Sequence, residues 1–510
     1  MAKLHPDLQN KSLPSFAQQE LDSFGIREFW YKDITLIPNR LPDFERDEVN
    51  LTASFTKKII LKTPFVSSPM DTVTGSEMAI LMALMGGIGV IHYNYSSIED
   101  QMTEVEKVKR FQAGFVFNPV VLSPQNTIKD IYEVNNKYGF FSAPITEDGT
   151  LNSKLVGIVT RRDVRYRKDM GTELKEVMTP REKLIVAFKK ETVDRNDLQA
   201  ANKVLKKNNL DTLPIVDEAD KIVALVTDSD IRKNEQFPLA TKNNNKQLRV
   251  FIAVESRLQL AKERIKKAYA FGVDGIVIDA SIVFREQIEI AKHCKQNFPE
   301  LEVVLGNIDS AQMVERIMEE GADYCDALRV GVGPGAACIT QQELGTGRAQ
   351  ASAVWDCAHA VKRLEPKYGP LPIIADGGIK VIDEIGQDVQ KPGDISKALA
   401  LGAQTVMMGS LLAGLEESPG EKEFDYEENR MVKKYRGMGS LEAMEGRSAT
   451  RYAVDKTKTR IAEGVVMKVP YRGPGYDFLL RLIIGVKQSL QKQGFKNIKE
   501  LQKYADIRPI

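Results

Sequence analysis

Residues 249–279, RVFIAVESRLQLAKERIKKAYAFGVDGIVID, contain two short apolar runs on either side of a helical stretch. Val250–Val254 and Gly275–Asp279 have the length and the composition of β-strands, and a longer polar segment with helical spacing separates them. A strand, a helix and a second strand in this order favour a parallel sheet that is covered by helices.

The same alternation extends over two parts of the chain, 62–111 and 249–410. The first part holds two strand-like runs and the second holds six, at 64–67, 87–91, 250–254, 275–279, 303–307, 327–332, 372–376 and 405–410. Eight parallel strands with intervening helices over about 250 residues are the pattern of a (β/α)8 TIM barrel. We therefore expect an α/β barrel formed by residues 1–113 and 236–510, with an inserted domain at 114–235.

The insert contains an internal repeat. Ala143-Pro144-Ile145 recurs as Leu213-Pro214-Ile215, and GIVTRRDVR at 157–165 recurs as ALVTDSDIR at 224–232. Each repeat predicts a short hairpin followed by a Thr-x-x-Asp turn that opens a helix. The pattern resembles a tandem pair of CBS modules, known as a Bateman domain.

The CBS resemblance implies a site for adenine or guanine nucleotides. The Thr and Asp side chains that would contact the ribose are Thr160, Asp163, Thr227 and Asp230. Helix capping without any ligand explains the same residues equally well.

Composition excludes several classes of protein. The 71 Lys and Arg among 510 residues balance 70 Asp and Glu, so no charge excess points to nucleic acid. Four cysteines without a CxxC spacing argue against a disulfide framework or a zinc site. The first 20 residues lack the apolar core of a signal peptide, and the longest apolar run, 78–91, is too short for a membrane helix. We expect a cytoplasmic protein without a membrane or nucleic-acid partner.

One cysteine lies in a place suited to chemistry. Residues 330–340, VGVGPGAACIT, place Cys338 in a glycine-rich loop directly after the sixth strand of the expected barrel. Glycines let backbone N–H groups approach a ligand, and a thiol near such groups is favoured as thiolate, the nucleophilic form. A lone cysteine is more often a small buried apolar residue, but the surrounding glycines favour a nucleophile.

Two further strand ends carry groups suited to a ribonucleotide monophosphate. Strand seven ends in Asp376-Gly377-Gly378, and strand eight ends in Gly409-Ser410. Glycine N–H groups and a hydroxyl suit a phosphate, and a carboxylate can accept two hydrogen bonds from ribose hydroxyls. Barrel active sites lie at this end of the strands, with phosphate commonly held after strands seven and eight. Another glycine-rich segment, 435–440, leads into a polar excursion to residue 470 that we expect to cover the barrel mouth as a flap, 431–470.

These motifs together resemble the IMP dehydrogenase family. The segments that carry the resemblance are 66–73, 331–340, 374–379, 407–410 and 435–441, and the insert lies where the family carries its CBS pair. The resemblance implies NAD-dependent oxidation of IMP to XMP in guanine nucleotide biosynthesis. The Cys338 thiolate would attack C2 of the purine, a hydride would leave to NAD, and water would hydrolyse the covalent intermediate.

The resemblance also implies roles for individual residues. Arg451 and Tyr452 would activate the water and Thr340 would orient it, although an arginine, being normally protonated, suggests a carboxylate or phosphate ligand on chemical grounds alone. The IMP-binding positions would be Ser68, Met70, Asp376, Gly378, Gly409, Ser410, Tyr435, Gly437, Met438 and Glu463. The NAD-binding positions would be Asp279, Asn307, Arg329, Gly331 and Gly333, and the carbonyls of Gly333, Gly335 and Cys338 would hold K⁺. The family forms homotetramers that often pair into octamers.

The chain departs from the family pattern at several places. Ala336 replaces a serine that contacts the phosphate, which removes one hydrogen bond of about 0.5 to 1.5 kcal/mol. The wall beside the nicotinamide also differs, because Ile282, Val283 and Phe284 replace small polar residues and a glycine. The sequence therefore leaves open whether NAD binds. The segment 380–394 is longer than in the family and is expected to be a solvated loop. The chain ends at Ile510 without the glycine-bearing tail that completes the K⁺ site, so we expect a weaker cation site.

Two other functions remain open. GMP reductase, an NADPH-dependent deaminase of GMP, has the same barrel and cysteine loop, but that family usually has a glutamate in the flap in place of Arg451-Tyr452. A nucleotide-binding regulatory paralogue without turnover would follow if Ile282, Val283 and Phe284 closed the cofactor site.

Overall fold

The computed structural model describes residues 28–510 except 112–114, 118, 152, 196, 229–235, 380–391 and 453–460. The chain divides into two compact units. The first comprises residues 1–108, 239–241 and 249–510, and the second comprises 109–238 and 242–248.

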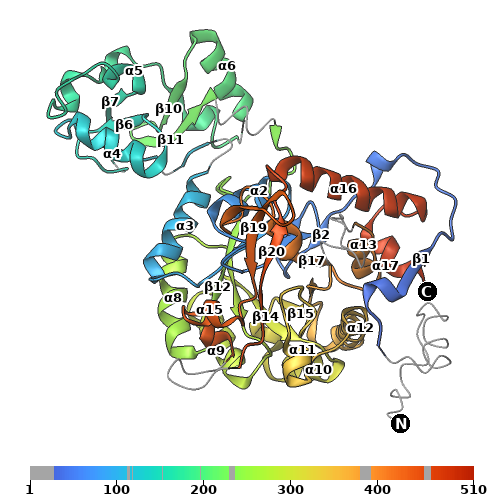
Figure 1. Ribbon diagram of the computed structural model, residues 1–510. Helices are drawn as coiled ribbons and strands as arrows, with labels where there is room; N and C mark the ends of the chain where they lie inside the picture. Colours follow the sequence, from blue (N-terminus) through green and yellow to red (C-terminus); the bar gives the residue numbers. More distant parts are fainter. Residues whose placement is uncertain are drawn as a thin grey trace. The chain divides into compact units, whose positions relative to one another are not determined.

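The first unit is built on a closed barrel of eight parallel strands (Figure 1). In spatial order these are β12 (Val250–Val254), β13 (Gly275–Asp279), β14 (Glu302–Ile308), β15 (Ala327–Val330), β16 (Ile373–Asp376), β17 (Thr405–Met408), β4 (Phe65–Ser67) and β5 (Ile88–Ile91). β5 pairs directly with β12, which follows the insert in sequence, so the insert does not interrupt the barrel. The predicted (β/α)8 fold and all eight of its strands are confirmed.

Helices surround the barrel (Figure 1). They are α2 (Ser76–Leu84), α3 (Ile98–Arg110), α8 (Leu258–Ala270), α9 (Arg285–Asn297), α10 (Ala311–Gly321), α12 (Gln350–Tyr368), α13 (Pro392–Ala400), α16 (Gly475–Lys492) and α17 (Ile498–Tyr504). α10 shows how the sequence forms these helices, with a polar cap at the start and one apolar face. The Ser310 side chain caps its first turn by accepting the Met313 N–H at 3.4 Å, and Val314, Ile317 and Met318 bury one face at helical spacing.

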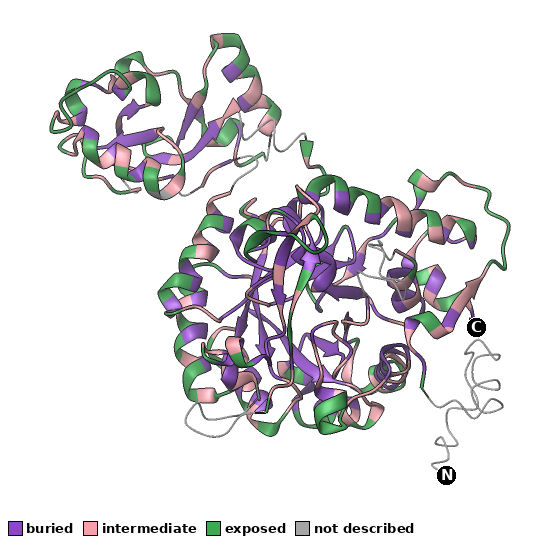
Figure 2. Cartoon of the chain, viewed as in Figure 1, coloured by how far each residue is buried: buried purple, intermediate pink, exposed green. Residues whose placement is uncertain are grey.

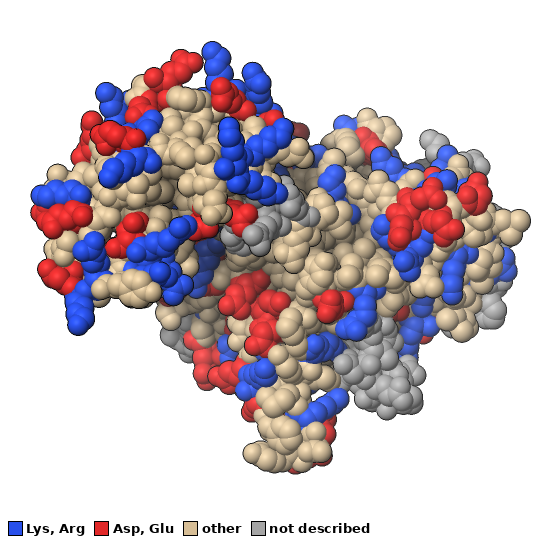
Figure 3. Space-filling model, turned by 90° about the horizontal axis from the view of Figure 1, so that it is seen from above, with Lys and Arg blue, Asp and Glu red and all other residues tan. Residues whose placement is uncertain are grey.

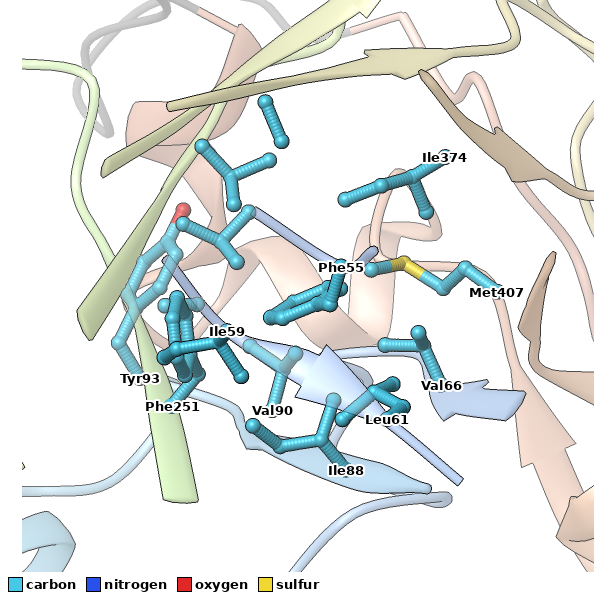
Figure 4. Close-up of a cluster of buried hydrophobic side chains, with 14 residues drawn as sticks. Phe55, Ile59, Leu61, Val66, Ile88, Val90, Tyr93, Phe251, Ile374 and Met407 are labelled. Atoms are coloured by element: carbon cyan, nitrogen blue, oxygen red, sulfur yellow. The ribbon is translucent and has the colours of Figure 1, made fainter. Parts of the chain in front are cut away.

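The interior of the barrel is packed with apolar side chains, and the strands are its most buried part (Figure 2). A hairpin of β2 (Ala53–Ser54) and β3 (Ile60–Leu61) adds Phe55, Ile59 and Leu61 to a cluster that includes Val90, Phe251 and Ile374 from the strands (Figure 4).

This hairpin closes the N-terminal end of the barrel. The Lys57 N–H donates to the carbonyl of Asp326, just before β15, at 3.0 Å, and the Lys58 N–H donates to the Glu302 carboxylate at the start of β14, at 3.2 Å. The opposite, C-terminal end of the strands is thereby left for the site.

Smaller elements lie around the barrel. β18 (Lys422–Asp425), β19 (Arg430–Arg436) and β20 (Val466–Pro470) form an antiparallel sheet, with α15 (Leu441–Met444) and the 3-10 helix η8 (Ser448–Tyr452) between β19 and β20. β1 (Ile34–Ile37) pairs with β21 (Asp506–Pro509), and the short helix α14 (Ser410–Ala413) follows β17.

The second unit contains two three-stranded sheets, one for each repeat. The first joins β6 (Ala143–Thr146), β7 (Leu155–Val159) and β8 (Thr179–Pro180), and the second joins β9 (Ala187–Phe188), β10 (Thr212–Val216) and β11 (Ile222–Thr227). Among its described residues, the α-helices are α4 (Ile128–Tyr138), α5 (Arg161–Val164) and α6 (Leu198–Asn208). Each sheet has its own apolar cluster, and a third cluster of Leu155, Val216 and Ile222 joins the two repeats.

The surface carries both signs of charge. Basic and acidic side chains are interspersed over much of the face seen in Figure 3, in keeping with the balanced composition. None of the helices in the described part of the chain combines the length and the apolar character needed to cross a bilayer.

Candidate active site

A cavity opens where the C-terminal ends of the barrel strands meet. Its empty volume, counted out to the open mouth, is about 890 Å³, which is the size range of small-molecule sites. Six of the eight strands contribute residues from their ends or from the segment that follows. Segments 435–439, Arg451 and Glu463 complete the lining.

Most of the predicted site residues lie in this cavity. Those that line it are Ser68, Met70, Asn307, Gly331, Gly333, Gly335, Cys338, Thr340, Asp376, Gly378, Gly409, Ser410, Tyr435, Gly437, Met438, Arg451 and Glu463. They come from segments distant in sequence, so the convergence is a property of the barrel topology and not of one motif.

The backbone of the cysteine loop requires glycine. Gly331 has a φ of 148° and a Cβ at this position would meet the carbonyl oxygen of Asp376. The loop turns back at Cys338, whose N–H donates to the Gly335 carbonyl at 3.0 Å. A β-bridge between Cys338 and Gly464 attaches the loop to the C-terminal part of segment 431–470.

Cys338 differs from the three other cysteines of the chain, all of which are described. Cys294, Cys325 and Cys357 are buried, whereas Cys338 is partly exposed and lines the cavity. Burial raises the pKa of the Cys294 and Cys325 thiols to about 12, so neither is a nucleophile near neutral pH. Cys338 is therefore the cysteine suited to attack a bound molecule.

A polar chain runs from the thiol to a carboxylate. The Thr340 hydroxyl lies 3.2 Å from the Cys338 sulfur and donates to Glu463 Oε2 at 2.9 Å. Desolvation raises the pKa of Glu463, and the Thr340 hydrogen bond and the charge of Arg451 oppose this rise. A raised pKa makes this carboxylate a stronger base than an ordinary surface glutamate.

Arg451 projects from η8 toward the end of β13. Its guanidinium forms an ion pair with Asp279, and its carbonyl accepts the Ser281 N–H at 3.0 Å. The backbone of Tyr452 ends η8, and its side chain lies outside the description.

Asp279 and Arg329 do not line the cavity. Both side chains are buried, and Arg329 Nη2 donates to Asp279 Oδ1 at 2.6 Å. Asp279 therefore lies between two arginines, Arg329 and Arg451. Asp279 ends β13, and Arg329 is the third residue of β15. Their opposite charges pair in the interior, and neither side chain lines the cavity.

Asp376 presents a carboxylate at the end of β16. It accepts a hydrogen bond from Asn307 Nδ2 at 3.1 Å, and Arg329 Nε lies 3.7 Å away. Desolvation raises the pKa of Asp376, while Arg329 and Asn307 lower it. The φ angles of Gly377 and Gly378, 89° and 81°, let the chain turn directly after this residue.

The end of β17 forms a narrow wall. A Cβ at Gly409 would come within 3.1 Å of both the Met70 sulfur and the Tyr435 hydroxyl, and Tyr435 Oη donates to Met70 Sδ at 3.6 Å. Ser68 and Ser410 are buried beside this wall. Backbone N–H groups and hydroxyls gathered here are suited to an anion such as phosphate.

The apolar stretch Ile282–Val283–Phe284 lies next to the cavity and does not fill it. Ile282 and Val283 are half-buried, Phe284 is 46% exposed, and none of the three lines the cavity. The Val283 N–H donates to the carbonyl of Asn307 at 3.0 Å, which fixes the stretch beside β14.

Ser281 and Gly439 line the cavity although the sequence did not single them out. Ser281 follows the end of β13 by two residues, and its position just after a barrel strand would have been the signal for it.

Within the second unit, Thr160 and Asp163 bind each other. The Thr160 N–H and hydroxyl donate to Asp163 Oδ2 at 2.7 and 2.8 Å, which caps α5. Thr227 ends β11, and Asp230 lies outside the described residues. The same is true of most of the expected loop 380–394.

Comparisons with known proteins agree with this geometry. The family model "IMP dehydrogenase / GMP reductase domain" matches residues 28–510. The chain is 42% identical to inosine-5′-monophosphate dehydrogenase of Schizosaccharomyces pombe over 486 residues, covering 93% of this chain and 87% of the relative. It is 38% identical to the enzyme of that name from Aquifex aeolicus, covering 93% and 91%.

Among solved structures, the chain is similar to a variant of GMP reductase from Trypanosoma brucei in complex with guanosine 5′-monophosphate. The two are 30% identical, the match covers 96% of this chain and 97% of the other, and the TM-score is 0.81.

Proposed function

Because the chain belongs to the IMP dehydrogenase / GMP reductase family, we propose that it oxidises IMP to XMP with NAD, through a covalent intermediate on Cys338. The observation that carries the proposal is the convergence of Cys338, the Thr340–Glu463 pair, Arg451 and Asp376 in one cavity. The curated relatives with this name cover most of the chain, which supports dehydrogenation over deamination.

The cavity supports a specific orientation of IMP. Asp376 would accept the ribose hydroxyls, and the phosphate would lie against Gly378, Gly409, Ser410 and Tyr435. The purine would then extend between Met70 and Met438, with C2 toward the Cys338 sulfur and Glu463 at its edge. Ala336 adds no hydroxyl, so the phosphate depends on the remaining donors.

The first stage forms a bond between the Cys338 sulfur and C2 of the purine, and a hydride leaves C2. NAD, when bound, accepts this hydride. Ser281, Asn307, Gly331 and Gly333 line the side of the cavity where it would bind. The Asn307 amide oxygen is buried and has no hydrogen-bond partner among the described residues, so a ligand donor fits there. Asp279 and Arg329 would act on this side indirectly, through their contacts with Arg451 and Asp376.

The second stage hydrolyses the covalent intermediate. Arg451 lies beside Ser281 and pairs with Asp279, so it occupies the side of the cavity that the cofactor would use. We infer that Arg451 and Tyr452 take this position after the reduced cofactor leaves. Thr340 then orients the water, and its hydroxyl relays the water's proton to Glu463. The water oxygen bonds to C2, and the C2–S bond breaks, which releases XMP and returns the Cys338 thiolate.

The K⁺ expected in the cysteine loop fits only in part. Carbonyl oxygens of Gly333, Gly335 and Cys338 are suitable ligands, but hard cations take about six oxygens or more. The Gly335 carbonyl also accepts the Cys338 N–H at 3.0 Å. We propose that the loop contributes part of a weak cation site, and no step of the reaction depends on it.

For the rest of the chain, we propose that residues 114–235 are a tandem CBS domain that binds adenine or guanine nucleotides through Thr160, Asp163, Thr227 and Asp230. Two sheets, each with its own apolar cluster, support the duplication. The capping bonds of Thr160 and Asp163 would have to open or be shared with a ribose. We also propose that residues 1–113 and 236–510 form the catalytic barrel. The protein would be cytoplasmic and would form homotetramers or octamers.

GMP reductase is the second candidate, because solved structures of that enzyme match nearly the whole chain. Two assays separate the candidates. Purified protein with IMP and NAD should form NADH, and with GMP and NADPH it should consume little or no NADPH. The reverse result would assign the deaminase, and neither activity together with IMP binding would assign a regulatory paralogue.

A further inference from the structure

Asn94, in the loop after β5, binds the segment that carries Arg451 to the cavity. We call residues 440–452 the cover segment. The Asn94 Oδ1 atom accepts the backbone N–H groups of Arg447 at 2.6 Å and Ser448 at 3.1 Å, and its Nδ2 lies 3.4 Å from the Ala443 carbonyl. One side chain therefore satisfies backbone groups at three positions of the cover segment.

The fit between Asn94 and the cover segment depends on Gly446. A Cβ at this position would overlap the Asn94 side chain. Gly446 does not have a positive φ, so its backbone conformation is open to other residues. The glycine is required here by the close approach of Asn94 and not by backbone strain.

Asn94 is itself held by hydrogen bonds to two residues that follow the ends of barrel strands, Asp71 and His92. Its Nδ2 donates to Asp71 Oδ2 at 2.7 Å, and its N–H donates to His92 Nδ1 at 3.0 Å. Burial lowers the pKa of His92 to about 4, so the ring is neutral near pH 7 and can accept this bond. Asp71 is held in turn by Arg436, whose Nη2 lies 2.6 Å from it.

A second contact supports the same end of the cover segment. Arg447 Nη1 lies 3.7 Å from Glu255, and Nη2 donates to the Ser96 carbonyl at 3.1 Å. Glu255 is buried and bound by Arg264 at 2.6 and 2.7 Å. The carboxylate is thus positioned before the cover segment docks.

We propose that Asn94 is a positioning residue that latches the cover segment and so places Arg451 over the cavity for the hydrolytic stage. It does not line the cavity. Arg451 follows the latched Ser448 by three residues within η8. The inference rests on the proposed function, because only the second stage uses Arg451, while the first needs the cofactor on the same side.

The test is a stopped-flow measurement of NADH formation with Asn94→Ala. The rate of the first turnover should stay within about twofold of wild type, and the steady-state kcat should fall about tenfold, the scale expected for losing the three hydrogen bonds to the cover segment. Equal losses in both phases, or no loss in either, would overturn the proposal.

Gly446→Ala provides an independent test from the cover side. It should reproduce the selective loss of steady-state turnover, because its methyl group displaces the segment from Asn94. The matched controls are Gly393→Ala, at a glycine with open space and no positive φ, and Asn39→Ala, whose amide donates to one backbone carbonyl on the surface. Both controls should behave as wild type, and unfolding temperatures report whether each variant is folded.

A second readout does not depend on the reaction. Because the three other cysteines are buried, alkylation by iodoacetamide reports Cys338. Asn94→Ala and Gly446→Ala should raise its alkylation rate about tenfold if the cover segment is released. If wild type forms no NADH but the alkylation rates of the two variants rise, the proposed function is wrong and the role of Asn94 in holding the cover segment is supported. Unchanged alkylation rates in folded variants would remove the latch whatever the reaction.

Discussion

The Thr340 hydroxyl donates a hydrogen bond to the Glu463 carboxylate at 2.9 Å and lies 3.2 Å from the Cys338 sulfur. The two residues are far apart in sequence, and a backbone bond from the Ile339 N–H to the Glu463 carbonyl at 2.9 Å holds their segments together. The cysteine loop and the C-terminal part of segment 431–470 are thus held together.

Removing this pair should slow hydrolysis selectively. Thr340→Val and Glu463→Gln should each lower steady-state kcat about a hundredfold, the usual scale of general-base catalysis, while the first turnover of NADH changes little. Thr346→Val, at an exposed threonine whose hydroxyl contacts a backbone carbonyl, is the matched control. A parallel loss in the first turnover would show that the pair acts before hydrolysis.

Asp376 should make IMP binding sensitive to acid. Desolvation raises its pKa, so the native carboxylate takes up a proton at a higher pH than it would in the unfolded chain. A nucleotide that needs the ionised form should lose affinity as the pH falls through this raised value.

Asp376→Asn should bind IMP more weakly and lose this component of the pH dependence. The difference in Kd between wild type and variant, measured by calorimetry over a pH series, cancels the titration of the phosphate itself. The same sign applies to stability. The native protein holds the extra proton between the unfolded and native pKa values, so wild type should lose stability relative to Asp376→Asn as the pH rises through that window.

Phe284 should contribute to NAD binding through its ring. It is 46% exposed beside Ser281 and Asn307, and an aromatic ring provides a surface on which a heterocycle can stack. Phe284→Ala should raise the KM for NAD about fivefold, with the KM for IMP unchanged. Phe271→Ala, an exposed phenylalanine at the C-cap of α8, should change neither. A lower KM for NAD in Phe284→Ala would show that the ring obstructs the cofactor.

The β2–β3 hairpin at the N-terminal end of the barrel should contribute to the stability of the fold and leave the reaction rate unchanged. Phe55 is fully buried and packs edge to face on Phe251, with ring centroids 4.9 Å apart. Phe55→Ala should lower the free energy of unfolding by about 3 to 5 kcal/mol. Below the unfolding temperature its kcat should match wild type, because the hairpin lies at the end opposite the cavity. Leu41→Ala, at a residue 95% exposed, is the control.

Much of the fold could be predicted because buried parallel strands are short, continuous apolar runs. The strand ends were less predictable. The run 327–332 was expected as one strand, but β15 stops at Val330, since Gly331 takes a positive φ. Glycine in the sequence allows such a turn without requiring it.

The location of the cavity could be predicted, because the residues that line it follow the ends of the strands. The direction in which each side chain points could not be predicted. Asp279 ends β13 and Arg329 is the third residue of β15, yet they are buried against each other and Arg451. Asn94 belongs to no motif, and only the folded chain brings it to Gly446. Contacts between such distant segments depend on the three-dimensional path of the chain, which a pattern along the sequence does not contain.

The most direct test of the central claim is mass spectrometry of acid-quenched protein during turnover with IMP and NAD. The Cys338 peptide should carry a covalent nucleotide adduct that requires both substrates, disappears as they are consumed, and is absent from Cys338→Ala, which should still bind IMP. Turnover by Cys338→Ala, or an adduct on another residue, would contradict the account.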